Sequence, residues 1–234
     1  MLLLPFAKLP CAMQNDRVLM YYNQLKHKQA QLFFKRLSDI IIAMLLLILL
    51  ALPMAVIAIM IKAGDNGEIL FRQRRVTQNL RVFTIYKFRT MRPAQSNKTR
   101  ITTFNDNRIT ALGKFLRRCH LDEIPQLINI LKGDMSFVGP RPELECFVAG
   151  FDNTMLATLL LPAGLTSATS LLFCNETKYL DSDDNERVYK ELLLPRKMAV
   201  NVKYIENFSL KEDIRVCFDT IKYFLKADID EFED

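Results

Sequence analysis

Histidine and paired cysteine are scarce in this sequence, and their scarcity removes the commonest metal sites and the disulfide scaffolds. His27 and His120 are the only histidines, so a site built from several histidine ligands is excluded. The five cysteines lie far apart and form no CxxC pair, which argues against a zinc ribbon and favours a reducing, cytoplasmic environment. P-loop, GxGxxG, HExxH and GxSxG motifs are absent as well. Carboxylate and arginine chemistry is what remains.

Apolar residues and positive charge are what the sequence has in quantity. Half of the 234 residues are hydrophobic and a quarter are charged, which excludes a disordered or collagen-like chain and indicates one globular domain with something added. Between residues 72 and 118 there are 13 Lys or Arg and one acidic residue, whereas residues 171–234 carry 15 acidic and 10 basic residues. The basic stretch would attract lipid headgroups or a phosphate-bearing substrate. No nucleic-acid partner is expected, because the stretch has no helix-turn-helix, zinc-finger or RNP signature.

A run of 22 uncharged residues, 40–61, is long enough for a membrane anchor. It is too long for the apolar core of a signal peptide. Pro53, in its middle, removes a backbone hydrogen bond, so a helix must kink or break there. Basic residues flank both ends of the run, which indicates that both ends lie on the cytoplasmic side. These arguments leave two topologies open, a re-entrant hairpin and a kinked transmembrane helix.

Turn residues and periodicity give a coarse layout for the rest of the chain. Residues 69–73 and 82–88 are predicted strands of a hairpin, with a turn at 77–79 between them. The polar residues 93–108 are expected to form a loop, and 110–118 a helix. A second short helix should run over 123–132 and stop at Gly133, followed by a rigid proline-rich loop with the sequence SFVGPRPELE.

Ser209 and Glu212 form a capping box, which should open a C-terminal helix. One face of this helix is apolar and consists of Ile214, Cys217, Phe218, Ile221, Phe224 and Leu225. We expect this stripe to pack into the core, with contact to a membrane surface as the alternative.

Asp122 and Glu123 are adjacent carboxylates at the start of the short helix, between Arg117 and Arg141. Two carboxylates could hold a magnesium ion, which prefers oxygen ligands and often bridges to substrate phosphates. The arginines could bind phosphate through two hydrogen bonds each. Spacing alone equally allows ordinary capping and dipole roles for the two carboxylates.

An ordered series of motifs covers most of the chain: KRLSDIIIAMLLLILLALPMAVIAIMIK, FRQRRV, YKFRTM, LDEIPQL, NILKGDMSFVGPRPE and YIENFSLKEDIRV. The series resembles the bacterial sugar transferase family, the monotopic polyprenyl-phosphate phosphoglycosyl transferases. The resemblance implies an α/β, mostly helical membrane domain with a re-entrant helix-break-helix at Pro53 and a small antiparallel β element. Residues 1–33 would be an N-terminal extension, 34–63 the re-entrant hairpin, and 64–234 a catalytic domain on the cytoplasmic face of the bacterial inner membrane.

The resemblance also implies a reaction. A sugar 1-phosphate would pass from a UDP-sugar to undecaprenyl phosphate, with release of UMP, as the first membrane step of surface glycan assembly. Asp122 would be the nucleophile that carries the sugar phosphate, and Glu123 would bind Mg²⁺ beside it. Arg141 and Arg117 match phosphate-binding arginines of the family. Two further alternatives stay open, direct magnesium-dependent transfer without a covalent intermediate and a non-catalytic, membrane-anchored adaptor.

Lys87 and Arg89, in YKFRTM, are additional candidates for substrate phosphate contacts. A homo-oligomer or glycosyltransferases of the same pathway are the protein partners that the resemblance leaves open. Three residues depart from the family pattern: Leu52 replaces a serine before the proline, Ser167 a glycine, and Asn201 an acidic residue. We expect these changes to bear on recognition of the donor sugar more than on activity. For residues 1–33 the sequence allows a peripheral amphipathic arm, a mis-assigned start or disorder.

Overall fold

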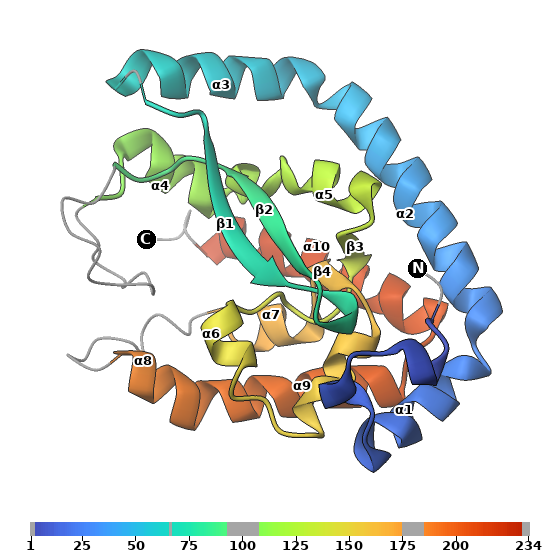
Figure 1. Ribbon diagram of the computed structural model, residues 1–234. Helices are drawn as coiled ribbons and strands as arrows, with labels where there is room; N and C mark the ends of the chain where they lie inside the picture. The colour runs from blue at the N-terminus through green and yellow to red at the C-terminus, as the bar shows by residue number, and fades with distance from the viewer. Residues whose placement is uncertain (1–2, 66, 93–107, 175–184, 231–234) are drawn as a thin grey trace.

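The protein is mostly helical, with two small β elements at its centre (Figure 1). The computed structural model describes residues 3–65, 67–92, 108–174 and 185–230. The helices are α1 Asp16–Lys26, α2 Gln29–Leu49, α3 Ala51–Asp65, α4 Ala111–Arg118, α5 Gln126–Lys132, α6 Glu145–Val148, α7 Ala168–Leu172, α8 Asn185–Val188, α9 Leu194–Glu206 and α10 Leu210–Asp230. The strands are β1 Leu70–Val76, β2 Val82–Phe88, β3 Met135–Val138 and β4 Ala163–Thr166. Short 3₁₀ turns include Leu121–Glu123 and Met155–Leu160, and a π-helical turn covers Tyr189–Leu193.

Helices α2 and α3 form a bent pair along one side of the molecule (Figure 1). Within the described residues no single helix is long and apolar enough to cross a membrane, but α2 and α3 pass that test together, with a bend of 61°. The break lies at Leu50 rather than at the predicted Pro53. Proline disrupts the carbonyl four residues earlier, here that of Leu49, which is the last residue of α2. Pro53 itself sits in the first turn of α3, where a missing N–H costs little.

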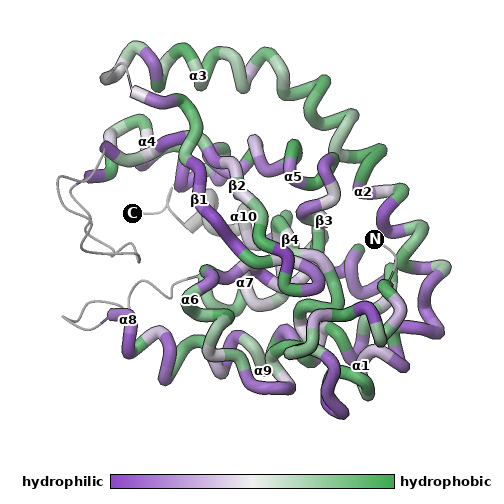
Figure 2. The backbone as a smooth tube through the Cα atoms, viewed as in Figure 1, coloured by the Kyte–Doolittle hydropathy of each residue, from purple (hydrophilic) through white to green (hydrophobic). Residues whose placement is uncertain are grey.

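Figure 2 shows that α3 and the end of α2 nearest to it consist largely of hydrophobic residues, and many of these side chains are exposed. Exposed apolar residues of the pair include Ile41, Ile42, Leu45, Ile48, Leu49, Leu52, Val56 and Ile59. The buried residues of α2 instead form a narrow stripe of Leu32, Lys35, Asp39 and Ala43, two of which are charged. On α3, Ile57 and Ile61 pack against Phe88 of β2 and Leu116 of α4. An ordinary surface helix buries its apolar face and exposes its polar face. Helix α2 does the reverse, because its exposed side chains are largely apolar and its buried stripe is partly charged.

The predicted β-hairpin is confirmed, with its first strand longer than expected. Strands β1 and β2 pair antiparallel from Leu70 opposite Phe88 to Val76 opposite Val82. Asn79 and Leu80 have positive φ values of 57° and 58° in the connecting turn. A second pair, β3 with β4, is parallel, and it differs from the predicted rigid loop that begins at Ser136.

Other predicted elements hold with small changes. The helix expected over 123–132 is divided into the 3₁₀ turn Leu121–Glu123 and α5, and Gly133 ends it at φ 82°. Helix α4 matches the expected 110–118, with Thr110 as its N-cap. The loop expected over 93–108 lies almost wholly outside the described residues.

The N-terminal segment belongs to the main core. Leu9, Met13, Val18 and Leu25 are each exposed by 3% or less and pack with residues of the Met155–Leu160 turn and of α9. Asn15 caps α1 by accepting a hydrogen bond from the Val18 N–H at 3.0 Å. Of the three alternatives for residues 1–33, neither disorder nor a peripheral arm describes the segment from Leu9 onward. The division into three domains stays a prediction.

Helix α10 buries a different face from the one that its apolar stripe predicts. Ile214, Phe218 and Ile221 are all more than half exposed, so the expectation that the stripe packs into the core is wrong for them. Asp213 and Val216 are buried instead. Ser209 does cap the helix, because its Oγ accepts from the Glu212 N–H at 3.2 Å. Polar contacts of Asp213 therefore decide which face of α10 turns inward.

A buried ion pair joins α2 to α10. The Lys35 Nζ lies 2.5 Å from Asp213 Oδ2, and the Tyr204 hydroxyl donates to Asp213 Oδ1 at 2.6 Å. Lys35 and Asp213 are 3% and 7% exposed. On the next turn of α2, Asp39 accepts from the Phe137 N–H of β3 at 3.3 Å. Arg36 donates to the last carbonyls of α5, those of Ile130 and Leu131, at 2.6 and 3.0 Å.

Replacing Lys35 with methionine leaves Asp213 without its buried partner. We expect Lys35→Met to lower the free energy of unfolding by about 3 to 5 kcal/mol, since a lone buried carboxylate is not compensated. Arg215→Ala removes an arginine whose side chain is 71% exposed. This control should change the free energy of unfolding by less than about 1 kcal/mol. Denaturant unfolding of both variants in detergent measures the difference. Equal losses in the two variants would contradict the role of the pair.

Candidate active site

Asp122 and Glu123 sit on a tight turn between α4 and α5. His120, directly after α4, has a left-handed backbone with φ 52°, which is unusual for a residue other than glycine. This conformation reverses the chain, so the 3₁₀ turn Leu121–Glu123 starts there. Asp122 is 9% exposed. A strained residue immediately before two buried or half-buried carboxylates is a common feature of functional sites.

Lys87, on β2, pairs with Glu123. Its Nζ lies 2.5 Å from Glu123 Oε1, and the two side chains are only 23% and 18% exposed. Burial raises the pKa of Glu123, but the charges of Lys87 and Arg141 and the hydrogen bond from Lys87 outweigh it and lower the pKa to about 2. Glu123 is therefore a carboxylate at every physiological pH.

Asp122 behaves in the opposite way. Burial raises its pKa above the ordinary value of 3.8, and the neighbouring Glu123 charge raises it further. Lys87, Arg117 and His120 act against this rise. Two adjacent carboxylates with pKa values shifted in opposite directions indicate two different roles.

Arg117 is held by the way α4 meets the end of β2. Its Nε donates to the Thr90 hydroxyl at 2.8 Å. The Thr110 N–H, at the N-cap of α4, donates to the Thr90 carbonyl at 3.1 Å. Gly113 lets the helix come this close, because a Cβ there would lie 2.1 Å from the same carbonyl oxygen. Arg117 is thereby fixed close enough to Asp122 to lower its pKa.

Arg141 lies in the loop between β3 and α6, flanked by Pro140 and Pro142. Its Nη1 donates to the Ser170 hydroxyl at 3.4 Å. Ser170 in turn belongs to the cap of α7, where Ser167 Oγ accepts from the Ser170 N–H at 2.9 Å. Ser167, which departs from the family pattern, thus stands one contact away from Arg141.

The structure brings three of the sequence-predicted residues, Glu123, Lys87 and Arg117, close to Asp122, and it brings Arg141 close to Glu123. Arg89 lies elsewhere, against Gly67, where an added Cβ would be 2.0 Å from Arg89 Nη1. Its predicted contact with substrate phosphate stays a prediction. Pro53 lies on the bent helix pair and touches none of these groups in any recorded contact.

Sequence reasoning missed three residues that shape this site: His120, Thr90 and Ser170. His120 had one signal, its place next to LDE, but a positive φ cannot be read from a histidine. Thr90 and Ser170 act through contacts between segments 27 and 29 residues apart, to Arg117 and Arg141. Side-chain pairing of this kind depends on the fold and leaves no periodic signal.

The residues present are compatible with a magnesium ion. No group of three or more His, Cys, Asp or Glu that could hold a metal occurs among the residues that the structure describes. Magnesium, however, is often bound by one or two carboxylates, with water and substrate phosphates completing its shell. Glu123 is ionised and uses one oxygen for Lys87, which leaves the other for such an ion. The donor set therefore fits an ion that arrives with a phosphate substrate.

Comparison with known proteins gives the family. The model of the bacterial sugar transferase family matches residues 30–227, which is more than four fifths of the chain. The chain belongs to the bacterial sugar transferase family. The match starts close to the beginning of α2 and leaves α1, with its buried side chains, outside.

Curated relatives agree with this assignment. The UDP-N-acetylgalactosamine-undecaprenyl-phosphate N-acetylgalactosaminephosphotransferase of Aeromonas hydrophila is 34% identical over 82% of this chain and 44% of its own length. The UDP-glucose:undecaprenyl-phosphate glucose-1-phosphate transferase of Escherichia coli is 33% identical over 80% of this chain and 39% of its own. The chain thus spans about two fifths of these relatives. The exopolysaccharide production protein ExoY of Sinorhizobium fredii is 32% identical and covered over 83% of its length.

The pair of Lys87 and Glu123 gives a testable pH dependence. Since the folded pKa of Glu123 lies below the ordinary 4.5, the pair stabilises the fold above pH 4.5 and loses this effect as the pH falls towards 2. We expect Lys87→Met to lower the free energy of unfolding by about 1 to 3 kcal/mol at neutral pH. The difference from wild type should shrink below pH 4.5, while Lys87→Arg should lose less. Unfolding curves at several pH values measure this, and a pH-independent difference would count against the pair.

Proposed function

We propose that the protein transfers a sugar 1-phosphate from a UDP-sugar to undecaprenyl phosphate and releases UMP. The observation that carries this proposal is the pair of carboxylates with opposite pKa shifts, surrounded by Lys87, Arg117 and Arg141. Both substrates are phosphate anions, and two of the relatives named above, those of Aeromonas hydrophila and Escherichia coli, are transferases to undecaprenyl phosphate. Positive charge around a carboxylate is what a reaction between two anions requires.

In the proposed reaction Asp122 is the nucleophile. Its carboxylate oxygen forms a bond to the phosphorus that carries the sugar, and the bond from this phosphorus to the bridging oxygen breaks, so UMP leaves with the electron pair. A phosphate oxygen of undecaprenyl phosphate then attacks the same phosphorus and displaces Asp122. Covalent catalysis of this kind divides one difficult displacement into two easier ones.

The pKa shifts suit these roles. Burial raises the pKa of Asp122, whereas the positive charges of Lys87 and Arg117 act against that rise and favour the carboxylate, which is the nucleophilic form. Glu123, ionised and paired with Lys87, would hold the magnesium ion that neutralises the diphosphate. Arg117 and Arg141 would stabilise the charge on the phosphate oxygens as the bonds change.

A labelling experiment separates the covalent route from direct transfer in a ternary complex. Enzyme incubated with a UDP-sugar and Mg²⁺, without acceptor, should gain the mass of one sugar phosphate on the peptide that contains Asp122. Asp122→Asn should gain none and should release UMP at background rate, with a decrease in turnover of about 10³-fold or more. A panel of UDP-sugars identifies the donor.

The direct route predicts no adduct in the wild-type protein, although turnover with both substrates would continue. Full turnover by Asp122→Asn would show that Asp122 is not the nucleophile. If no UDP-sugar in the panel supports transfer, the result favours the alternative of a non-catalytic, membrane-anchored adaptor.

We further propose that α2 and α3 enter and leave the cytoplasmic leaflet of the inner membrane as a re-entrant hairpin. The 61° bend, the apolar exterior of the pair and the basic residues at both ends support this arrangement. The exposed stripe of Ile214, Phe218 and Ile221 on α10 would lie at the same membrane surface.

Labelling of single cysteines tests this topology. In a background with all five cysteines replaced by serine, Gln29→Cys and Glu68→Cys place thiols before and after the bent pair at exposed positions. A re-entrant hairpin predicts that neither thiol in intact spheroplasts reacts with a membrane-impermeant maleimide, and that both react after lysis. Reaction of one thiol in intact spheroplasts would show a transmembrane span instead.

A further inference from the structure

The loop that carries Arg141 has no secondary structure of its own. It connects Val138, the last residue of β3, with Glu145, the first residue of α6. Pro140 and Pro142 fix their own φ angles but do not determine where the Arg141 side chain lies relative to Glu123. Contacts with other parts of the chain must determine that.

Backbone contacts hold the two ends of the loop. The Gly139 N–H donates to the Thr166 carbonyl at 3.2 Å, and the Gly164 N–H donates to the Pro140 carbonyl at 2.9 Å. On the other side, Arg75 Nη1 donates to the Pro142 carbonyl at 3.1 Å. These bonds place the loop between β1 and β4.

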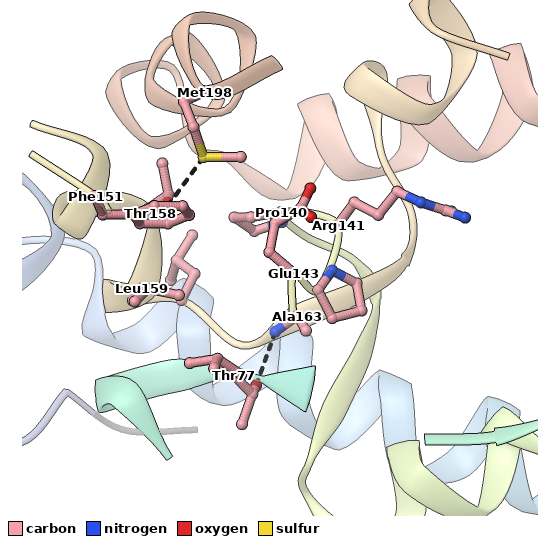
Figure 3. Close-up of a pocket in the computed structure, with 12 residues that line it drawn as sticks. Thr77, Pro140, Arg141, Glu143, Phe151, Thr158, Leu159, Ala163 and Met198 are labelled. Atoms are coloured by element: carbon pink, nitrogen blue, oxygen red, sulfur yellow. Dashed lines mark hydrogen bonds between the residues drawn. The ribbon is translucent and has the colours of Figure 1, made fainter. Parts of the chain in front are cut away.

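Glu143 is the charged residue of this loop whose side chain is buried. It is 5% exposed, and the Tyr189 hydroxyl lies 2.8 Å from each of its carboxylate oxygens. Lys197 Nζ donates to the Tyr189 hydroxyl at 2.8 Å and lies 3.5 Å from Glu143 Oε1. We call Glu143, Tyr189 and Lys197 the Glu143 cluster. Figure 3 shows Glu143 and Arg141 in the same loop, with the Arg141 side chain extending away from the pocket beside them.

Burying the charged groups of the Glu143 cluster in the core costs free energy. Tyr189 and Lys197 are 6% and 2% exposed, and removing a carboxylate and an ammonium from water costs several kcal/mol each before their attraction is counted. Apolar side chains of similar size would stabilise such a position as well or better. The π-helical turn that begins at Tyr189 is itself a feature found mostly at functional sites.

We propose that the Glu143 cluster is the positioning device for Arg141. Tyr189 and Lys197 hold the Glu143 carboxylate inside, and this fixes the backbone two residues before it. The inference rests on the proposed function, because it assigns Arg141 to the substrate's phosphates.

Removing the Tyr189 hydroxyl tests the device with little change in volume. We expect Tyr189→Phe to raise KM for the UDP-sugar roughly tenfold, with kcat little changed, since the hydrogen bonds of the hydroxyl with the charged groups of Glu143 and Lys197 are lost. Tyr21→Phe is the matched control, because Tyr21 is equally buried and its hydroxyl lies 3.3 Å from Glu206, at the far end of α9. The control should leave KM within twofold.

A double-mutant cycle decides whether the effect passes through Arg141. In an Arg141→Gln background, Tyr189→Phe should add less than a twofold loss in kcat/KM. The same tenfold loss in both backgrounds, or a lower amount of active enzyme with unchanged KM, would overturn the proposal and leave a structural role.

Binding of UDP by calorimetry separates this proposal from the proposed function. If the wild-type protein binds UDP but transfers no sugar, the proposed function fails, and weaker UDP binding by Tyr189→Phe still supports the positioning role. If wild type turns over and Tyr189→Phe binds UDP equally well, the positioning role fails alone. A wild-type protein that neither binds UDP nor turns over contradicts both.

Discussion

The buried pair of Lys35 and Asp213 is the contact on which the arrangement of this protein depends. It joins α2, the first helix of the bent pair, to α10, and the Lys35 Nζ lies 2.5 Å from Asp213 Oδ2. One turn along α2, Asp39 accepts a hydrogen bond from β3. Lys35 and Asp39 are the two charged residues in the buried stripe of α2, so their contacts help to determine how the bent pair is oriented relative to the rest of the fold.

The active-site geometry follows from the same helix. Arg36 caps the C-terminal end of α5, whose other end follows directly on Asp122 and Glu123. Strand β3, held by Asp39, leads into the loop that presents Arg141. On the other side, Ile57 and Ile61 of α3 pack against β2 and α4, which carry Lys87 and Arg117. The bent helix pair is therefore part of the framework of the site as well as a membrane anchor in the proposed arrangement.

Local signals predicted what is local in this fold. Alternation and turn residues gave the hairpin, capping residues gave the starts of α4 and α10, and a glycine gave the end of α5, because each depends on a few neighbouring residues. The parallel pairing of β3 with β4, the inward face of α10 and the core position of α1 depend on distant partners. For α10 the apolar stripe even predicted the wrong face, since the pairing of Asp213 outweighs it. The motif LDE drew attention to Asp122 and Glu123, whereas the contacts of Lys87, Arg117 and Arg141 around them depend on the fold.

The distance in sequence between Lys35 and its partner has a consequence for synthesis. The two residues are 178 positions apart, and Tyr21 and Lys28 likewise contact residues made at the end of the chain. A ribosome therefore completes the apolar helix pair long before Asp213 exists, so Lys35 lacks its partner while these helices form. In the proposed topology this unpaired charge would keep the start of α2 from being drawn through the membrane. The pairing of Lys35 with Asp213 of α10 would then keep the start of α2 on that side of the membrane.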